Sequence, residues 1–155
     1  RVRTPYVLFL DADIFVKDPG LINHCLRVAM GGNYDLVTCH FKTTTGEYNW
    51  MFKIFSVVQR IISLKTPFAV GGFMFFKTEK FRALGGFNEQ AKVAEDYLLS
   101  SKVKPSRFKI INESVYTTPR RFKNKGVMYM VKLMISSWWN RNNPEWFKQD
   151  HNYWK

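Results

Sequence analysis

Acidic residues are scarce in this chain of 155 residues, and their scarcity leaves a large positive charge. Twelve Asp and Glu residues stand against 24 Lys and Arg residues, so the formal net charge is 24 − 12 = +12. Such an excess attracts nucleic acid, anionic membranes or phosphate-bearing substrates. It also solubilises a protein surface, so charge alone does not choose among these partners.

Cysteine is scarce as well. Cys25 and Cys39 are too few for a disulfide framework, and they lack the close paired spacing of zinc ligands. Both lie in apolar segments, which predicts buried free thiols in a reducing compartment. His24, His40 and His151 are dispersed along the chain, and we assign a catalytic role to none of them.

Long apolar runs are also missing. None approaches the roughly 20 residues of a membrane-spanning helix, and low-complexity segments and internal repeats are absent from the sequence. With 46% hydrophobic residues, the chain still has enough apolar material for one sizeable core. The composition therefore predicts one folded domain without a transmembrane segment.

The order of the segments predicts an α/β fold. Short β-branched and aromatic segments alternate with segments of helical periodicity, which is typical of a mostly parallel sheet flanked by helices. The first strand, YVLFL, is continuously apolar and is predicted to be covered on both faces. Asp18 is a candidate helix N-cap and Pro19 a candidate first helical residue. The predicted strands are 6–10, 34–41, 67–76 and 108–116, and the predicted helices lie within 17–32, 50–64, 78–86 and 94–103.

Two carboxylates follow the first predicted strand. Asp11 and Asp13 lie where that strand ends, and ligands of open α/β sheets bind outside the carboxyl ends of strands. Two carboxylates this close repel each other unless a cation or hydrogen-bond donors compensate them. Mg²⁺ or Mn²⁺ carrying a phosphate would do so. The alternative is that both side chains cap a turn or pair with nearby lysines.

Two further motifs each have two interpretations. Gly71 and Gly72 interrupt an apolar strand, which marks either a close approach by a ligand or backbone, or a plain irregularity of the sheet. Glu95 and Asp96 begin a predicted helix. There they either interact with the helix dipole or supply a general base.

An arginine pair follows the last predicted strand. Arg120 and Arg121 stand in the segment TTPRRF. Guanidinium groups bind phosphate in bidentate fashion, so the pair is a candidate for binding a pyrophosphate. The alternative is a solvated basic face.

These motifs occur in an order that is more specific than any one of them. LFLDADIFV is followed by AVGGFMFFKTEKFRALGGFNE, then AEDYLLSSKV, then TTPRRF. This pattern covers nearly the whole chain and closely resembles the inverting glycosyltransferases of family 2, which have the GT-A fold. The resemblance implies metal-dependent, inverting transfer of a sugar from a UDP- or GDP-sugar to a hydroxyl of a glycan or lipid-linked acceptor, in cell-envelope glycan biosynthesis.

The resemblance also implies roles for individual residues. Asp96 matches the catalytic base, with Glu95 beside it, and GGFNE at 85–89 matches a turn of the family. Asp13 matches a ligand of Mg²⁺ or Mn²⁺, and Asp11 matches a position near the nucleotide or in the metal shell. The implied donor and acceptor pocket takes in Gly71, Gly72 and Phe73, and Arg120 or Arg121 adds positive charge at the departing diphosphate.

Two departures from the family pattern change what we expect of this chain. TTPRRF replaces the Gln-x-x-Arg-Trp motif of polymerising members, so we expect a non-processive enzyme. The family's first βα units, which bind the nucleobase, are not found in this chain, and no predicted element precedes the first strand. We therefore expect a partial GT-A catalytic domain at 1–126, which by itself binds donor poorly or is inactive, and a helical tail at 127–155.

The tail is a candidate membrane-surface helix. In GVMYMVKLMISSWWNRNN the apolar residues recur near helical spacing, and Lys132 and Arg141 are available for a polar side. We predict a cytoplasmic protein that lies at the inner face of the plasma membrane, where basic charge meets anionic lipid. The alternative is a helix packed on the catalytic domain.

Two other functions remain open. A nucleic-acid-binding module would display aromatic and basic residues on one surface, whereas Trp50, Phe52, Trp138 and Trp139 lie largely in core-like apolar runs. We therefore expect no nucleic-acid partner. The second alternative is an inactive fragment that keeps the fold without turnover.

Overall fold

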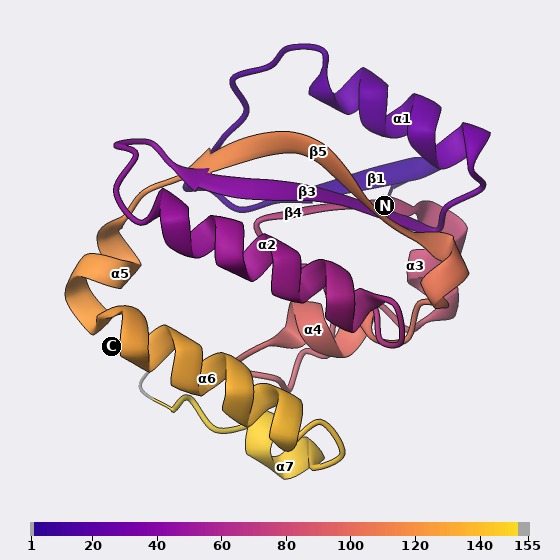
Figure 1. Cartoon of the computed structure of the whole chain (residues 1–155). Helices are drawn as coiled ribbons and strands as arrows, with labels where there is room; N and C mark the ends of the chain where they lie inside the picture. The colour runs from indigo at the N-terminus through magenta and orange to yellow at the C-terminus, as the bar shows by residue number, and fades with distance from the viewer. Residues whose placement is uncertain (1, 152–155) are drawn as a thin grey trace.

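The computed structural model describes residues 2–151, so residues 152–155 of the predicted tail lie outside it. Within that range the chain forms a five-stranded sheet with helices on both sides (Figure 1). The elements in chain order are β1 (Tyr6–Leu10), β2 (Ile14–Phe15), α1 (Leu21–Gly31), β3 (Leu36–Thr43), α2 (Asn49–Ser63), β4 (Phe73–Lys77), α3 (Thr78–Ala83), α4 (Glu95–Ser100), the short 3-10 helix η1 (Pro105–Arg107), β5 (Phe108–Thr117), α5 (Arg120–Lys125), α6 (Val127–Trp139) and α7 (Pro144–Phe147).

Different helices cover the two faces of the sheet. α1 lies on one side, and α2, α4 and α6 lie on the other (Figure 1). Because successive strand residues point to opposite faces, β4 contributes to both layers. Phe73 and Phe75 pack in the core layer that contains α1, whereas Met74 and Phe76 pack in the layer that contains Leu99 of α4. Within residues 2–151, no helix is both long enough and apolar enough to span a bilayer.

The expectation of a mostly parallel sheet is wrong. The strands lie in the order β1-β4-β3-β5-β2, and only β3 and β5 are parallel neighbours. The pairs β1–β4, β3–β4 and β2–β5 are antiparallel. β1, β3 and β5 do run in one direction, but β4 is inserted between β1 and β3 in the opposite direction. An alternation of strands and helices along a sequence specifies neither which strands pair nor the direction of an inserted strand.

β1 differs from the central, doubly covered strand that its apolar sequence predicts. It is half-buried and lies at the edge of the described sheet, while β3 and β4 are the most buried strands. Its apolar residues nevertheless contact aromatic rings on both faces. Tyr6 stacks on Phe75, and Phe9 packs against Phe81 and Phe87.

The first helix begins later than its sequence predicts. α1 begins at Leu21 with Gly20 as its N-cap, so Pro19 is not the first helical residue. Asp18 still contributes locally, because its Oδ1 accepts a hydrogen bond from the Gly20 N–H at 2.8 Å. The two residues belong to the turn that leads into the helix and not to the helix itself.

The buried thiols predicted from the sequence are confirmed. Cys25 of α1 and Cys39 of β3 are free and fully buried in the same core layer. Burial raises the pKa of Cys25 to about 12, and it raises the pKa of Cys39 as well. Both thiols are therefore protonated at neutral pH and behave as small apolar side chains.

Gly72 stands where the backbone leaves no room for a side chain. A Cβ atom at this position would lie 2.8 Å from Cε1 of Phe41 and 3.0 Å from Cδ1 of Ile14. Gly71 and Gly72 directly precede β4 and do not interrupt it, which corrects the predicted strand boundary. The absence of a side chain at Gly72 lets β2 and β3 pack against the beginning of β4.

Gly72→Ala should therefore lower the free energy of unfolding by about 1–3 kcal/mol, because Phe41 and Ile14 must move away from the added methyl group. Gly31→Ala is the matched control, since nothing lies within 4 Å of a Cβ at the end of α1. The control should be neutral or stabilising by up to about 1 kcal/mol. Urea denaturation measures both variants, and equal midpoints would contradict the tight packing at Gly72.

Candidate functional site

The antiparallel pairing of β1 with β4 brings the acidic and glycine motifs together. Leu10 at the end of β1 pairs with Phe73 at the beginning of β4, and the Asp11 N–H donates to the Gly72 carbonyl at 3.5 Å. The end of one strand and the beginning of the other therefore share one edge of the sheet. A parallel β4 would place the glycines at the opposite end of β1.

Gly71 connects this edge to the Glu-Asp motif. Its N–H donates to Oδ2 of Asp96 at 2.6 Å, and the N–H of Tyr97 donates to Oδ1 at 2.7 Å. A Cβ on residue 71 would lie 3.3 Å from the same Oδ2. Glycine at position 71 thus permits a close approach by the side-chain carboxylate of Asp96.

A strained residue precedes the motif. Ala94 has a φ of 53°, in the left-handed region that is uncommon for residues other than glycine, and α4 begins directly after it at Glu95. Strain of this kind persists only where the surrounding structure enforces it, and it is concentrated at functional sites. In this chain the strained residue, Ala94, lies directly before α4. Asp96, in the first turn of that helix, accepts the hydrogen bond from the Gly71 N–H.

The carboxyl of Asp96 titrates near neutral pH. Its pKa is raised to about 7, first by burial, then by the charge of Glu95 and less strongly by that of Asp11. The hydrogen bonds from the N–H groups of Gly71 and Tyr97 oppose this rise. Protein atoms enclose the carboxyl, although part of the residue stays accessible. A carboxylate with a pKa near 7 is well matched to accept a proton from a hydroxyl.

Asp11 and Asp13 form a second acidic group beside it. Asp11 is largely accessible, yet neighbouring protein atoms remove part of the water around its carboxyl. That desolvation raises the pKa of Asp11, the charge of Asp13 raises it further, and the charge of Arg121 lowers it. The two carboxylates therefore repel each other, as expected from their spacing.

These residues fit a cation that is shared with a phosphate. Within residues 2–151, no three or more His, Cys, Asp or Glu side chains are grouped to hold a metal ion. Asp11 and Asp13 offer two carboxylates whose mutual repulsion a cation would relieve. Mg²⁺ is commonly bound by one or two carboxylates together with the phosphates of its substrate, and Mn²⁺ also favours oxygen ligands.

A pocket of about 470 Å³ lies at this group of acidic residues, a volume typical of small-molecule sites. Its walls combine apolar residues of β1 with two acidic residues, Asp11 and Glu95. Phe87, from the GGFNE turn, contacts the ring of Phe9 edge-on, with the two centroids 4.9 Å apart. The pocket is lined by Leu8, Phe9, Leu10, Asp11, Gly71, Phe87 and Glu95.

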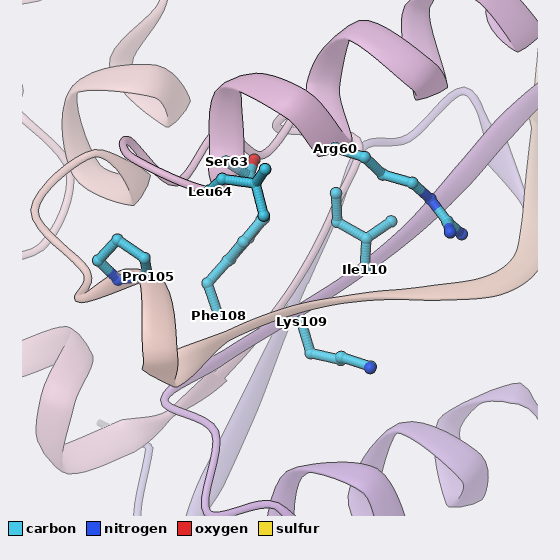
Figure 2. Close-up of a pocket in the computed structure, with 7 residues that line it drawn as sticks. All are labelled: Arg60, Ser63, Leu64, Pro105, Phe108, Lys109 and Ile110. Carbon is cyan, nitrogen blue, oxygen red and sulfur yellow. The ribbon is translucent and has the colours of Figure 1, made fainter.

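A second pocket, of about 420 Å³, lies at the opposite end of the sheet (Figure 2). It is formed by the end of α2 and the beginning of β5, where Phe108 pairs with Leu36, and Leu36 in turn pairs with Phe76. Its lining contains no carboxylate, whereas that of the first pocket contains Asp11 and Glu95. The lining residues are Arg60, Ser63, Leu64, Pro105, Phe108, Lys109 and Ile110.

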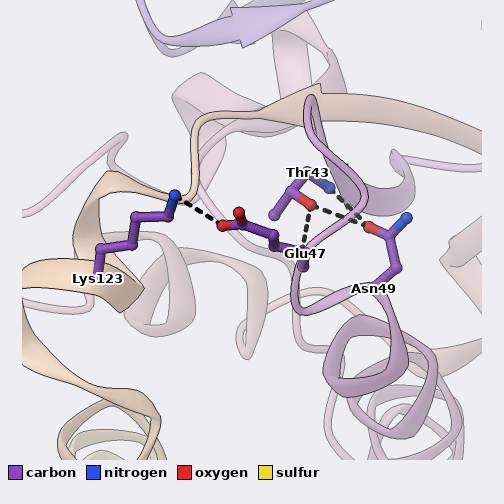
Figure 3. A network of polar contacts seen from close by, with 4 residues as sticks. All are labelled: Thr43, Glu47, Asn49 and Lys123. Carbon is purple, nitrogen blue, oxygen red and sulfur yellow. Dashed lines mark hydrogen bonds and ion pairs between the residues drawn. The ribbon is translucent and has the colours of Figure 1, made fainter.

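The helix that carries the arginine pair is attached to the turn between β3 and α2 (Figure 3). Lys123 of α5 forms an ion pair with Glu47 at 2.8 Å, and the Glu47 carbonyl accepts a hydrogen bond from the Thr43 hydroxyl. Oδ1 of Asn49 accepts a second hydrogen bond, from the Thr43 N–H, at 2.9 Å. This network connects the end of β3, the beginning of α2 and α5.

Aromatic contacts strengthen the same attachment. Phe122 of α5 stacks on Tyr48 and packs edge-on against Phe52, with centroid separations of 5.5 and 5.4 Å. α5 is therefore held by both polar and apolar contacts. In this position Arg121 is close enough to Asp11 to lower its pKa.

The structure connects most of the predicted site residues and separates two of them. Phe73 is fully buried in the core, where its carbonyl accepts the Thr38 hydroxyl at 2.8 Å. Arg120 is exposed at the first position of α5. The residues connected by hydrogen bonds, by charge or by the pocket are Asp11, Asp13, Gly71, Gly72, Glu95, Asp96 and Arg121.

Sequence reasoning missed the apolar wall of the pocket. Leu8, Phe9 and Leu10 look like core residues in the sequence because they belong to a continuous apolar strand. Phe87 lies inside GGFNE, a segment for which the family resemblance implies a turn. The one sequence signal for the role of Phe87 in the pocket is that an aromatic residue follows two glycines in a loop.

Comparison with known proteins supports the fold. No protein-family model matches the chain, and no curated protein matches its sequence. Among solved structures it is similar to the mannosyltransferase PcManGT from Pyrobaculum calidifontis in complex with GDP-Man and Mn²⁺. The fold resembles that of a GT-A glycosyltransferase. The TM-score is 0.57 at 16% sequence identity, and the match covers 96% of this chain and 44% of that one. The chain thus spans less than half the length of that glycosyltransferase, and the similarity shows the fold alone.

Asp96→Asn should change how stability depends on pH. The pKa of Asp96 is about 7 in the folded state and near 3.9 in an unfolded chain, so the folded state binds the additional proton between these values. Its contribution to stability is complete below about pH 4 and is lost as the pH rises through about 7. From pH 4 to 8, wild type should therefore lose on the order of a few kcal/mol relative to Asp96→Asn.

Calorimetric Tm values across this pH range measure the difference. Glu145→Gln is the control, because this carboxylate is exposed and, among the described residues, forms its ion pair with Lys148 on the surface. It should keep the wild-type pH profile. If the curves for wild type and Asp96→Asn run parallel, the pKa of Asp96 is not raised.

Proposed function

We propose that this chain carries the catalytic residues of a family 2 inverting glycosyltransferase that transfers a sugar from a nucleotide-sugar to an acceptor hydroxyl. One observation carries the proposal: Asp96, with a pKa of about 7, is held by the Gly71 N–H next to a pocket that contains Asp11. The GT-A-like fold supports it, and so does the complex of a similar mannosyltransferase with GDP-Man and Mn²⁺.

Asp11 and Asp13 would hold Mg²⁺ or Mn²⁺ together with the diphosphate of a GDP- or UDP-sugar. When bound, the metal neutralises charge that develops on the departing diphosphate. Arg121 lies close enough to Asp11 to add positive charge at the same place. Arg120, exposed on the same helix, is a further candidate for contact with the phosphates.

Asp96 would act as the general base. Its carboxylate takes the proton of the acceptor hydroxyl while the hydroxyl oxygen forms a bond to the anomeric carbon. The bond from that carbon to the phosphate oxygen breaks, and the nucleoside diphosphate leaves from the opposite face, so the configuration inverts. Burial raises the pKa of this base to about 7, and the charge of Glu95 beside it adds to the rise.

The acceptor would be a glycan or a lipid-linked sugar of cell-envelope biosynthesis, extended without processivity. The absence of the polymerising Gln-x-x-Arg-Trp motif from TTPRRF supports the non-processive reaction. A cytoplasmic location agrees with the free, buried thiols of Cys25 and Cys39.

Asp96→Asn in the full-length gene product should lower kcat by roughly 10²–10⁴-fold, because the general base is lost. The Kd for the donor should stay within about twofold of wild type, since Asn keeps the volume of the side chain. Glu79→Gln is the control, an exposed carboxylate at the other end of β4 that pairs with Lys77. Turnover equal to wild type in Asp96→Asn would remove Asp96 from the base role.

Asp13→Asn should weaken donor binding at least about tenfold when Mn²⁺ is present and leave it unchanged when Mn²⁺ is absent. Isothermal titration with GDP-mannose and UDP-glucose, each with and without Mn²⁺, measures this and identifies the nucleotide. Asp18→Asn is the control in the next loop, between β2 and α1, because its turn hydrogen bond to Gly20 is available to Asn as well. Metal-independent binding in wild type would contradict a shared cation.

A further inference from the structure

Exposed apolar side chains are concentrated on two helices. Among the described residues, sixteen large hydrophobic residues are exposed, and eleven of them belong to α2, to Leu64 directly after it, or to α6. We call these eleven the α2–α6 apolar surface. They are Trp50, Ile54, Val57, Val58, Ile61 and Leu64 from the first segment, and Met128, Val131, Ile135, Trp138 and Trp139 from α6.

α2 is apolar on the side away from the core as well as on the side that faces it, where Phe52 packs against the core and Phe55 contacts Phe68. Its fully buried residues are polar: Gln59 donates to the Phe68 carbonyl at 2.6 Å, and the Ser63 hydroxyl accepts the Phe68 N–H at 3.2 Å. On the opposite side, Trp50, Ile54, Val57, Ile61 and Leu64 recur at intervals of three and four residues, and each is 57–77% exposed. A helix of a globular protein normally turns its apolar stripe towards the core. This stripe must therefore be explained by something outside the described chain.

α2 and α6 lie on the same side of the sheet, the side away from α1 (Figure 1). α5 connects them, because Phe122 packs on Tyr48 and Phe52 at the beginning of α2 while α6 follows α5 after Gly126. The sequence alone indicated only α6 as a candidate membrane-surface helix. The structure adds α2.

The two segments that carry this surface contain basic residues and no acidic ones. Residues 48–65 and 119–143 contain no Asp or Glu and nine basic residues. The nearby Glu47 is already paired with Lys123. The nine basic residues are Lys53, Arg60, Lys65, Arg120, Arg121, Lys123, Lys125, Lys132 and Arg141.

We propose that the α2–α6 apolar surface docks on an anionic lipid bilayer, with its aliphatic and tryptophan side chains at the acyl boundary and the surrounding Lys and Arg residues at the headgroups. Apolar helix faces bordered by basic residues bind membranes in this way, and each Lys or Arg near an anionic surface strengthens the binding. This inference goes beyond the proposed reaction and does not depend on it.

The charge pattern decides between a bilayer and the other possible occupants. A second copy of the chain on this surface would bring together two sets of basic residues from segments that contain no Asp or Glu. Nucleic acid would match the charge of this surface. Its bases stack on aromatic rings, however, so exposed Ile, Val, Leu and Met side chains would contribute little to binding it. An anionic bilayer matches both the charge and the apolar residues.

Co-sedimentation with vesicles tests the proposal. Wild type should bind vesicles of equal parts phosphatidylcholine and phosphatidylglycerol, and bind pure phosphatidylcholine at least about tenfold more weakly. Ile54→Ser with Ile61→Ser should lower the partition coefficient about tenfold, because two exposed apolar side chains are removed. The matched control is Ile22→Ser with Met30→Ser on α1, which removes two exposed apolar side chains from the other side of the sheet and should bind like wild type.

A variant that lacks two lysines tests whether the basic residues contribute to membrane binding. Lys53→Gln with Lys132→Gln should weaken binding to anionic vesicles about tenfold and reduce its salt dependence, while Arg27→Gln on α1 should not. Because all of these positions are exposed, the variants should keep the circular dichroism spectrum and Tm of wild type. Binding that needs no donor also separates this test from the proposed reaction.

Three results would overturn the inference. The first is wild type that does not bind anionic vesicles. The second is binding that the α1 variants reduce as much as the α2 variants do. The third is a dimer in sedimentation equilibrium that Ile54→Ser with Ile61→Ser dissociates, because the surface would then be an interface between two copies.

Discussion

The register between β1 and β4 is the constraint on which the site depends. With Leu10 opposite Phe73, Asp11 follows at Gly72 and the Gly71 N–H reaches Asp96. A shift of one residue would turn every side chain of β1 to the other face, which would remove Phe9 from its contacts with Phe81 and Phe87. The apolar packing that selects the register therefore also selects the position of the carboxylates. Stability and chemistry share one determinant in this part of the fold.

The chain as a whole is positively charged, whereas the candidate site is negatively charged. Over the whole chain the charge is +12, which raises the local concentration of anionic molecules. Within the site, Asp11, Asp13, Glu95 and Asp96 form a negative centre in which Asp11 and Asp96 already bind protons more readily than free aspartates. A negative centre in a positive protein suits a ligand that is itself anionic but arrives with a cation. A nucleotide diphosphate with its metal has that charge pattern.

The parts of the fold that could be predicted are those determined by local patterns. Apolar periodicity located β1, β3, α2 and β5, and the motif order indicated the fold and which residues would meet. The direction of β4 could not be predicted, because antiparallel insertion is decided by which strand edges remain free and not by the strand's own residues. The burial of Phe73 and the part that Phe87 has in the pocket depend on that same pairing, and so were missed. The exposed stripe of α2 was hidden for a related reason, since periodicity shows that a helix has an apolar face without showing where that face points.

The two buried thiols provide a way to follow local opening of the fold in solution. Cys25 belongs to α1 and Cys39 to β3, and both are inaccessible and protonated in the folded state. An alkylating reagent reacts with a thiolate at the surface, so it modifies these residues only after α1 has moved away from the sheet. The rate of labelling then measures local opening of one layer of the molecule through its native cysteines, without an engineered thiol. The acidic site at the edge of β1 contributes no cysteine to that signal.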